Sequence, residues 1–498
     1  MIRKNIIANV IARAWGVISV YLFVPLYLKF LGIEAYGLVG FYSTLLAVCA
    51  FADMGFTATL NREMARLSVR KDSAGEMRDL LRTYELIYLG ISLALASTMW
   101  ALAPLIASDW LHSTLLHPRE LALAIRLMGL AIVFQLPSGL YIGGLMGMQR
   151  QVGANSIQIA WGVCRGVGAV LILWLYSPTI YAFAAWQLIS NVLYCFSARF
   201  ILWRGMPPEP AHHRPGFSLR SLRTTWRYSI GITGMALIST VLTQTDKLAV
   251  SKLLPLTMLG YYSLAGAVAG VPLMLAGPIG SAFFPRMTGL VALEDCDTLT
   301  RLYHRACSLV AIATIPAGLT VAAFAGECIY VWTGSAVAAD RAGLAASLLI
   351  CGQLMQATTL IPYYLGLAHG NVEVVILVGI ASVVVITPLL LFLVMKYGIV
   401  GAGVSWLIMN VCTLPPYMYA IHRRFLPGEF RTWALSDVGR PLLAALPGII
   451  LCRFLLPSTS SRLLALGLIG AVWAVSTVAA AATSLDVREW VLRRRAYV

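Results

Sequence analysis

Residues 373–395 read EVVILVGIASVVVITPLLLFLVM, and Glu373 at the start is the only charged side chain in this run. About 20 consecutive apolar residues suffice for a helix to cross the hydrocarbon core of a bilayer. The stretch therefore predicts a transmembrane helix, and the same test can be applied to the rest of the chain.

The composition supports a membrane protein. Of the 498 residues, 59% are hydrophobic and 12% are charged, and the mean hydropathy is +0.80. Soluble domains carry about 25% charged residues. With 21 acidic residues in the chain, too little polar surface is available to cover a globule of this size, so we expect lipid to surround most of it.

Thirteen further apolar segments qualify as spans, the last two forming a shorter pair. They are residues 6–30, 38–60, 84–107, 121–146, 154–176, 180–201, 228–250, 260–284, 303–325, 342–366, 401–421, 441–456 and 463–484. A basic segment rich in proline lies between the two halves. Neither a helix interior nor a bilayer tolerates such a segment, so we interpret it as a connector.

We expect an all-α integral membrane protein with about 14 transmembrane helices. The predicted parts are a six-helix lobe at 1–202, a cytoplasmic connector at 203–227, a second six-helix lobe at 228–422, and two additional helices with a basic cytoplasmic tail at 423–498.

The distribution of basic residues predicts the orientation. With a cytoplasmic N-terminus, 26 of the 37 Lys and Arg residues fall in cytoplasmic segments, five in outer loops and six inside spans. Basic residues are retained on the cytoplasmic side of membrane proteins, so both termini are expected there. The formal net charge of +16 is then a topology signal and an attraction to anionic membrane lipids, and no nucleic-acid partner is expected.

The two lobes carry traces of an internal repeat. A shift of 223 residues places identical residues on one another at the pairs 7/230, 29/252, 31/254, 37/260 and 48/271. Because six helices separate the copies, the repeat is parallel, with a pseudo-two-fold axis along the membrane normal.

Several motifs resemble the polysaccharide transporter family, the Wzx-type oligosaccharide flippases. The first half carries LGIEAYGLVGFYS at 31–43, DMG at 53–55 and LNRE at 60–63, and the second half carries TDKL at 245–248, SKLL at 251–254 and GYYSLA at 260–265. With the helix layout, the resemblance covers nearly the whole chain.

The resemblance implies a member of the superfamily that also holds multidrug exporters and the lipid II flippase, with alternating access between two six-helix lobes. It implies translocation of undecaprenyl-diphosphate-linked oligosaccharide across the bacterial inner membrane for O-antigen or exopolysaccharide assembly, with a polysaccharide polymerase and chain-length machinery as partners. The lipid II flippase is known for an arginine cluster that includes its helix eight. The span 260–284 contains no charge, which disfavours that assignment.

Ionisable residues inside spans are functional candidates, because a charge at mid-bilayer costs about 2.5–3.5 kcal/mol on insertion scales. The candidates are Arg13, Asp53, Arg126, Arg165, Asp246, Lys247 and Arg453. Most of the basic ones lie near a span end and can reach the interface. Arg165 lies at the centre of its span and is least easily explained as an anchor.

Polar faces in the first lobe suggest a wet cavity. Gln158 precedes Arg165 by seven residues, which places the two within about 20° of each other around a helix. The expected substrate-binding residues are Arg165, Arg13, Gln158, Gln187, Asn191 and Arg126. A guanidinium suits a diphosphate because it stays protonated and binds phosphate oxygens as a fork. The alternative, that these residues hydrogen-bond one another between helices, stays open.

Asp53, Asp246 and Lys247 are the candidates for ion coupling. Asp246 adjoins Lys247 near the outer end of its span, where a local ion pair is the competing explanation. No lysine follows a glycine in the chain, so there is no Walker A loop. We expect a secondary transporter and not an enzyme, without a cofactor, that draws on a proton or sodium gradient or on membrane potential.

Two other functions remain open at this stage. One is a multidrug/cation antiporter of the same superfamily, which would favour acidic and aromatic cavity residues for cationic drugs over arginines inside the membrane. The other is an integral-membrane glycan polymerase, although the outer loop at 326–340 is short for such an enzyme. Finally, the glycines at 139, 143 and 147 predict a close-packing stripe on one helix.

Overall fold

The computed structural model describes residues 2–70, 73–207, 215–370, 373–455 and 461–483. Part of the predicted connector, at 208–214, and the tail from 484 lie outside these residues. The described chain is helical almost throughout and contains no β-strand, only an isolated bridge between His112 and Pro255. The expected all-α class is confirmed.

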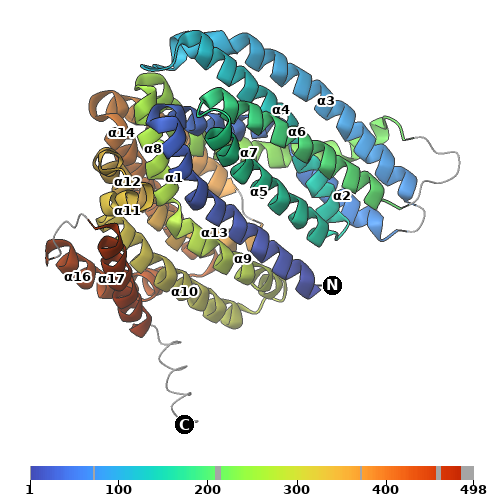
Figure 1. The fold of residues 1–498 in the computed structure, drawn as a ribbon. Helices are drawn as coiled ribbons and strands as arrows, with labels where there is room; N and C mark the ends of the chain where they lie inside the picture. Colours follow the sequence, from blue (N-terminus) through green and yellow to red (C-terminus); the bar gives the residue numbers. More distant parts are fainter. Residues whose placement is uncertain (1, 71–72, 208–214, 371–372, 456–460, 484–498) are drawn as a thin grey trace. The chain divides into compact units, whose positions relative to one another are not determined.

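The contacts group the chain into two compact units, residues 1–260 and 261–498. Unit 1 contains α1 (Ile2–Cys49), η1 (Ala50–Asp53), α2 (Phe56–Ser68), α3 (Ala74–Leu105), η2 (Ile106–Trp110), α4 (Pro118–Gly147), α5 (Gln151–Leu175), α6 (Ile180–Gly205), α7 (Leu219–Leu253) and the first turn of α8 (Leu256–Ala269) (Figure 1).

Unit 2 contains the rest of α8 and the remaining helices. These are α9 (Val271–Ala292), α10 (Cys296–Ala323), α11 (Ala325–Thr333), α12 (Ala336–Thr358), α13 (Leu360–Ala368), α14 (Glu373–Phe425), α15 (Phe430–Thr432), η3 (Trp433–Gly439), α16 (Arg440–Leu455) and α17 (Arg462–Ala482) (Figure 1).

α7 packs against α1, α2 and α3 within unit 1, whereas the sequence assigns it to the second lobe. The predicted lobes are defined by the internal repeat, whereas the units are defined by contacts within the folded chain. The two boundaries therefore need not coincide. The predicted lobe boundaries therefore stay a prediction.

The predicted spans correspond to helices in the structure. Eleven helical stretches of the described chain are long and apolar enough to cross a membrane. Two of them, 11–53 and 377–425, each contain a break, at Gly32 (φ 77°) and Gly398 (φ 62°), where a left-handed conformation favours glycine. Counting these two stretches twice and adding the 35-residue α7 gives the fourteen predicted crossings.

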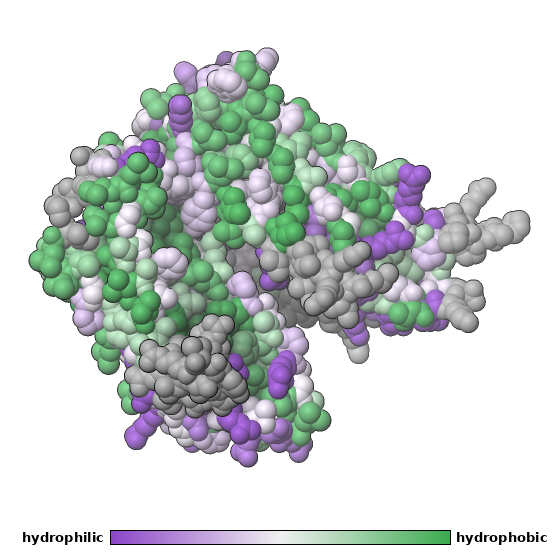
Figure 2. Space-filling model, turned by 60° about the horizontal axis from the view of Figure 1, so that its bottom comes forward, coloured by the Kyte–Doolittle hydropathy of each residue, from purple (hydrophilic) through white to green (hydrophobic). Residues whose placement is uncertain are grey.

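Large apolar side chains are exposed on the surface. Figure 2 shows hydrophobic residues over much of the visible face. Trp174, Leu175 and Phe454 are 67%, 70% and 84% exposed. Water would penalise such a surface, and lipid does not, so the chain is a multi-pass membrane protein.

The predicted helix at 38–60 is interrupted in the structure. η1 ends at Asp53, Met54 and Gly55 have positive φ angles, and α2 begins at Phe56. The interruption places Asp53 immediately before the N-terminus of α2, where the first backbone N–H groups have no partner inside the helix.

Glu34 of the motif at 31–43 is a structural anchor. Its side chain is buried, and its carboxylate accepts hydrogen bonds from the Ser113 hydroxyl (2.5 Å), the Thr114 N–H (2.8 Å) and hydroxyl (2.7 Å), and the Leu115 N–H (2.9 Å). The motif residue thus fixes the loop between η2 and α4 on α1.

The crossing of α1 and the first turn of α8 reflects the internal repeat. A Cβ on Gly37 would collide with the carbonyl oxygen of Leu256, and a Cβ on Gly260 would collide with the carbonyl oxygen of Ile33. The 223-residue shift relates Gly37 to Gly260 and Ile33 to Leu256. The two contacts are therefore copies of one another, and they explain why this pair of repeat positions holds glycine.

Helix α4 is the centre of unit 1. It packs against α2, α3, α5 and α6, and Figure 1 shows it among these helices. A Cβ on Gly143 would lie 2.9 Å from the Thr57 carbonyl oxygen, and one on Gly147 would collide with the Asn61 carbonyl oxygen. The predicted packing stripe is confirmed at these two glycines.

The stripe has an internal control, because a Cβ on Gly139 would meet nothing closer than the Thr57 hydroxyl at 3.6 Å. We expect Gly147→Ala to lower the free energy of unfolding by about 1–3 kcal/mol through overpacking, and Gly139→Ala to change it by about 0.5 kcal/mol or less. Thermal unfolding of the purified protein measures both. Equal unfolding midpoints for the two variants would contradict the packing described.

Candidate functional site

Arg165 lies half-buried on α5 in a stack of aromatic rings. Its guanidinium carbon is 4.6 Å from the centre of the Trp161 ring. Trp161 in turn stacks on Tyr194 of α6, with ring centres 4.4 Å apart and planes 13° apart. No carboxylate of the described chain forms an ion pair with Arg165. The arginine is held by a cation–π contact, and no described carboxylate neutralises its charge.

Asn191 is a connector between helices. Its side-chain oxygen accepts from Trp161 Nε1 (3.1 Å), and its amide nitrogen donates to the Ala131 carbonyl (2.9 Å), Gln135 Oε1 (3.1 Å) and the Tyr42 hydroxyl (3.3 Å). These bonds position Trp161 beneath Arg165. The Asn191 amide is thus hydrogen-bonded within unit 1, as expected if these polar residues bond one another between helices. Its role in substrate binding stays a prediction.

Gln187 lies one turn before Asn191 on α6 and is also buried. Its Oε1 atom has no hydrogen-bond partner in the described part of the chain. Burying an amide oxygen without a partner is unfavourable, so this oxygen is a free acceptor inside unit 1.

A polar cavity of about 460 Å³ lies between α1, α2, α5 and the end of α4. Its lining consists of Arg13, six amide side chains and two apolar residues: Asn9, Asn61, Gln149, Gln151, Asn155, Gln158, Ala12 and Met146. The described lining contains no carboxylate. Two predicted residues, Arg13 and Gln158, therefore meet in one cavity.

Part of this lining is preorganised by hydrogen bonds. The Asn9 amide donates to Gln151 Oε1 (3.0 Å), and the Asn155 amide donates to Asn9 Oδ1 (2.5 Å). Arg165 is not among the lining residues. It lies two turns beyond Gln158 on the same face of α5, about 10 Å along the helix axis.

Arg126 lies elsewhere in unit 1. Its guanidinium packs over the Trp100 ring of α3, 4.8 Å from the ring centre. The structure brings it neither to the cavity nor to the Arg165 stack.

Asp53 holds the break before α2. Its carboxylate accepts hydrogen bonds from the Thr57 hydroxyl (2.5 Å), from the Thr57 N–H (3.3 Å) and from the Tyr88 hydroxyl of α3. The carboxylate stabilises the N-terminus of α2, and its role in ion coupling stays a prediction.

The other two candidates for ion coupling lie together on α7. Both Asp246 and Lys247 are half-buried, and the Lys247 ammonium donates to Gln244 Oε1 at 3.3 Å. They belong to a different part of unit 1 from the cavity lining.

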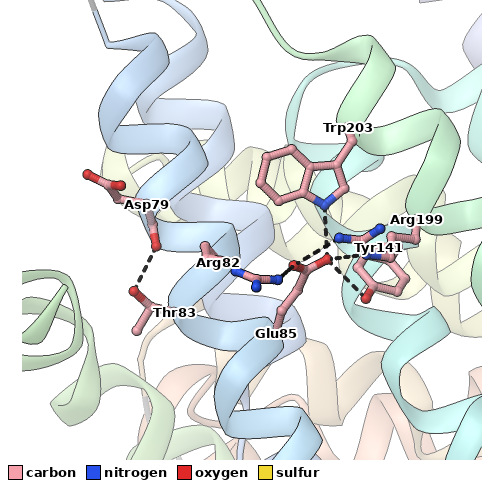
Figure 3. A network of polar contacts seen from close by, with 7 residues as sticks. All are labelled: Asp79, Arg82, Thr83, Glu85, Tyr141, Arg199 and Trp203. Carbon is pink, nitrogen blue, oxygen red and sulfur yellow. Dashed lines mark hydrogen bonds and ion pairs between the residues drawn. The ribbon is translucent and has the colours of Figure 1, made fainter. Parts of the chain in front are cut away.

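The sequence did not identify the network around Glu85, which Figure 3 shows. Glu85 of α3 is buried and accepts hydrogen bonds from Arg199 Nε (2.7 Å), Trp203 Nε1 (2.9 Å) and the Tyr141 hydroxyl (3.2 Å). Arg82 adds an ion pair at 3.1 Å. Glu85 and Arg199 both lie near the ends of predicted spans, where a charged side chain is ordinarily explained by contact with the membrane interface. Only their pairing across 114 positions reveals the network.

We expect Glu85→Ala to lower the free energy of unfolding by about 2 kcal/mol. Four donors lose a shared acceptor, and the cost is reduced because the Arg199 side chain is 41% exposed. The control is Glu76→Ala, because the Glu76–Arg70 pair is 3.5 Å long and exposed on both sides; such pairs contribute less than about 1 kcal/mol. Thermal unfolding compares the variants, and an equal effect in both would rule out a structural role for the network.

The fold is shared with solved transporters. The lipid II flippase MurJ in an inward closed conformation matches with a TM-score of 0.72 at 13% identity, covering 95% of this chain and 97% of that one. An inward-facing multidrug resistance MATE family transporter matches with a TM-score of 0.62 at 13% identity, covering 86% and 99%.

The relatives found by sequence carry names that refer to polysaccharide transport and biosynthesis. The chain is 23% identical over 388 residues to a putative O-antigen transporter of Shigella flexneri, covering 76% of this chain and 87% of the relative. It is 25% identical over 354 residues to the succinoglycan biosynthesis transport protein ExoT of Rhizobium meliloti (strain 1021), covering 69% and 67%. A family model described as "Polysaccharide biosynthesis protein" matches residues 2–291, more than half of the chain. The chain belongs to this polysaccharide biosynthesis protein family, in agreement with the resemblance found in its motifs.

Proposed function

We propose that the chain is a flippase that translocates undecaprenyl-diphosphate-linked oligosaccharide across the bacterial inner membrane by alternating access, for O-antigen or exopolysaccharide assembly. The proposal is supported by the family and by relatives that carry the names O-antigen transporter and succinoglycan transport protein. Both termini are cytoplasmic in this proposal, and a polysaccharide polymerase and chain-length machinery are downstream partners.

The observation that carries the proposal is the chemistry of unit 1. The described lining of its cavity offers one guanidinium and six amides without a carboxylate, and Arg165 adds a second cation that forms no ion pair within the described residues. Sugar hydroxyls need partners that both donate and accept, which amides provide. A diphosphate needs cations that stay charged away from water, which arginines provide.

The multidrug/cation antiporter has less support. The similarity to MATE structures at 13% identity concerns the fold alone. A carrier of cations would gain from acidic groups in its cavity, and the described lining of the unit 1 cavity offers a cation instead.

Substitution of Arg165 tests the proposal. We expect Arg165→Ala to abolish polysaccharide export while the protein remains inserted, and Arg165→Lys to restore export only partly because an ammonium lacks the planar fork. The matched control is Arg204→Ala, which removes an exposed arginine at the end of α6. Surface polysaccharide and membrane-inserted protein are measured in a strain lacking the chromosomal copy. Normal export by well-expressed Arg165→Ala would show that Arg165 does not bind the cargo.

The energy source is part of the same proposal. A membrane potential of 100 mV supplies about 2.3 kcal/mol per charge moved, enough to bias a two-state carrier. A coupled proton or sodium ion requires an anionic site, and Asp53 is the carboxylate we assign to it.

We expect Asp53→Asn to slow gradient-driven flipping, because it removes the charge and retains an oxygen that can accept from Thr57. Thr57→Val serves as the control that weakens the same hydrogen bonds without removing the charge. Asp246→Asn is expected to affect folding or gating instead. Flipping is followed in proteoliposomes under imposed pH and sodium gradients. A gradient-dependent rate that Asp53→Asn leaves unchanged would remove Asp53 from the coupling mechanism.

A further inference from the structure

In unit 2, a half-buried histidine joins α10 to the segment that begins the C-terminal helices. His304 of α10 contacts Asp437 of η3 through Nδ1 (2.6 Å) and Glu429, which precedes α15, through Nε2 (3.1 Å). The Ser308 hydroxyl donates to the second oxygen of Asp437 at 3.1 Å. The side chains of His304, Asp437 and Glu429 are 19%, 7% and 33% exposed.

The hydrogen-bonding capacity of these groups determines how many protons they hold. A neutral imidazole has one N–H, and an ionised carboxylate only accepts. With a neutral His304 and two carboxylates, one ring nitrogen would direct its lone pair at a carboxylate oxygen. Both contacts are satisfied only when the three side chains share one additional proton, either on the ring or on a carboxyl group.

His422 of α14 provides a contrast in the same neighbourhood. Its Nδ1 faces the Met418 carbonyl at 2.7 Å, and its Nε2 faces the Tyr303 hydroxyl at 2.7 Å. A carbonyl accepts and a hydroxyl can donate, so a neutral His422 satisfies both contacts. The partners therefore assign an additional proton to the His304 cluster and none to His422.

The charged and titratable groups that act on His304 come from three directions: Asp437 on η3, Glu429 before α15, and His422 on α14 with its partner Tyr303 on α10. α9, α11, α12, α13, α16 and α17 also pack on α10, but within the described chain none of them supplies an ion-pair partner to His304.

We propose that His304, Asp437 and Glu429 form a proton-binding site, and that its proton fastens residues 429–439 to α10. These residues lead directly into α16, so the attachment of the segment that enters the C-terminal helices depends on protonation, while α16 and α17 also pack on α10 directly. Glu429, a third exposed, gives the proton access to water. The hydrogen bonds determine the direction of the pH dependence. The attachment of residues 429–439 is complete at low pH, and it weakens as pH rises because the shared proton leaves. The proposal does not depend on the transported substrate.

Hydrogen–deuterium exchange of the full-length protein in lipid nanodiscs tests the proposal. Protection of peptides covering 426–440 is compared between pH 6 and pH 9 after correction for intrinsic exchange rates. In the unsubstituted protein we expect protection to fall about ten-fold at the higher pH, the size of one hydrogen bond to a charged group. In His304→Gln we expect low protection at both pH values.

Two controls keep the result interpretable. Tyr303→Phe removes the hydroxyl that faces His422 and leaves the three proton-sharing groups in place, so its pH dependence should match that of the unsubstituted protein. Peptides from α4 and α6 should exchange alike in all variants, which verifies the fold of His304→Gln. Protection of 429–439 that does not depend on pH, or a pH dependence that persists in His304→Gln, would overturn the proposal.

Discussion

A chain inside a bilayer must satisfy its backbone N–H and C=O groups from within, because lipid offers no hydrogen-bond partner. The helices of the described chain follow from this constraint, and so does the treatment of their interruptions. Where α2 begins after the break at Met54 and Gly55, Asp53 accepts the free N–H of Thr57. In the loop between η2 and α4, the N–H groups of Thr114 and Leu115 donate to Glu34 of α1. Irregular backbone is tolerated because carboxylates satisfy it.

Buried charges obey the same constraint and fall into two groups. Glu85 with Arg199, and His304 with Asp437 and Glu429, are compensated between helices far apart in the sequence. Arg165 is not compensated by a carboxylate of the described chain and rests on the Trp161 ring. Compensated groups connect helices, whereas a cation without a counterion in a transporter of this family is suited to an anionic cargo.

Helix packing sets where these groups meet. Among the candidate membrane spans of the described chain, those formed by α4 and α10 are the most buried of their units. Small residues allow close approach: Gly143 and Gly147 bring α4 against α2, and Gly37 and Gly260 bring α1 against the first turn of α8, which belongs to unit 1. The cavity of unit 1 lies beside the first contact, since Asn61, whose carbonyl meets Gly147, also lines it.

The site was only partly predictable. Gln158 and Arg165 were placed on one face from their spacing, and the structure adds Arg13 to Gln158 in a cavity but leaves Arg165 in a separate stack. Asn191 was expected at the substrate, and its amide is occupied by Trp161, Ala131, Gln135 and Tyr42. The spacing of two residues along a helix shows whether they share a face of that helix. It does not show which neighbouring helix covers that face.

The membrane class, the succession of spans, the repeat and the family can be inferred from the amino-acid sequence, because hydropathy and short motifs are properties of stretches of about 20 residues. Which polar groups meet is visible only in the folded chain. Glu85 and Arg199 lie 114 positions apart, and His304 and Asp437 lie 133 positions apart. Such pairs depend on how each helix is rotated and on which helix packs beside it, and no local pattern in the chain encodes either.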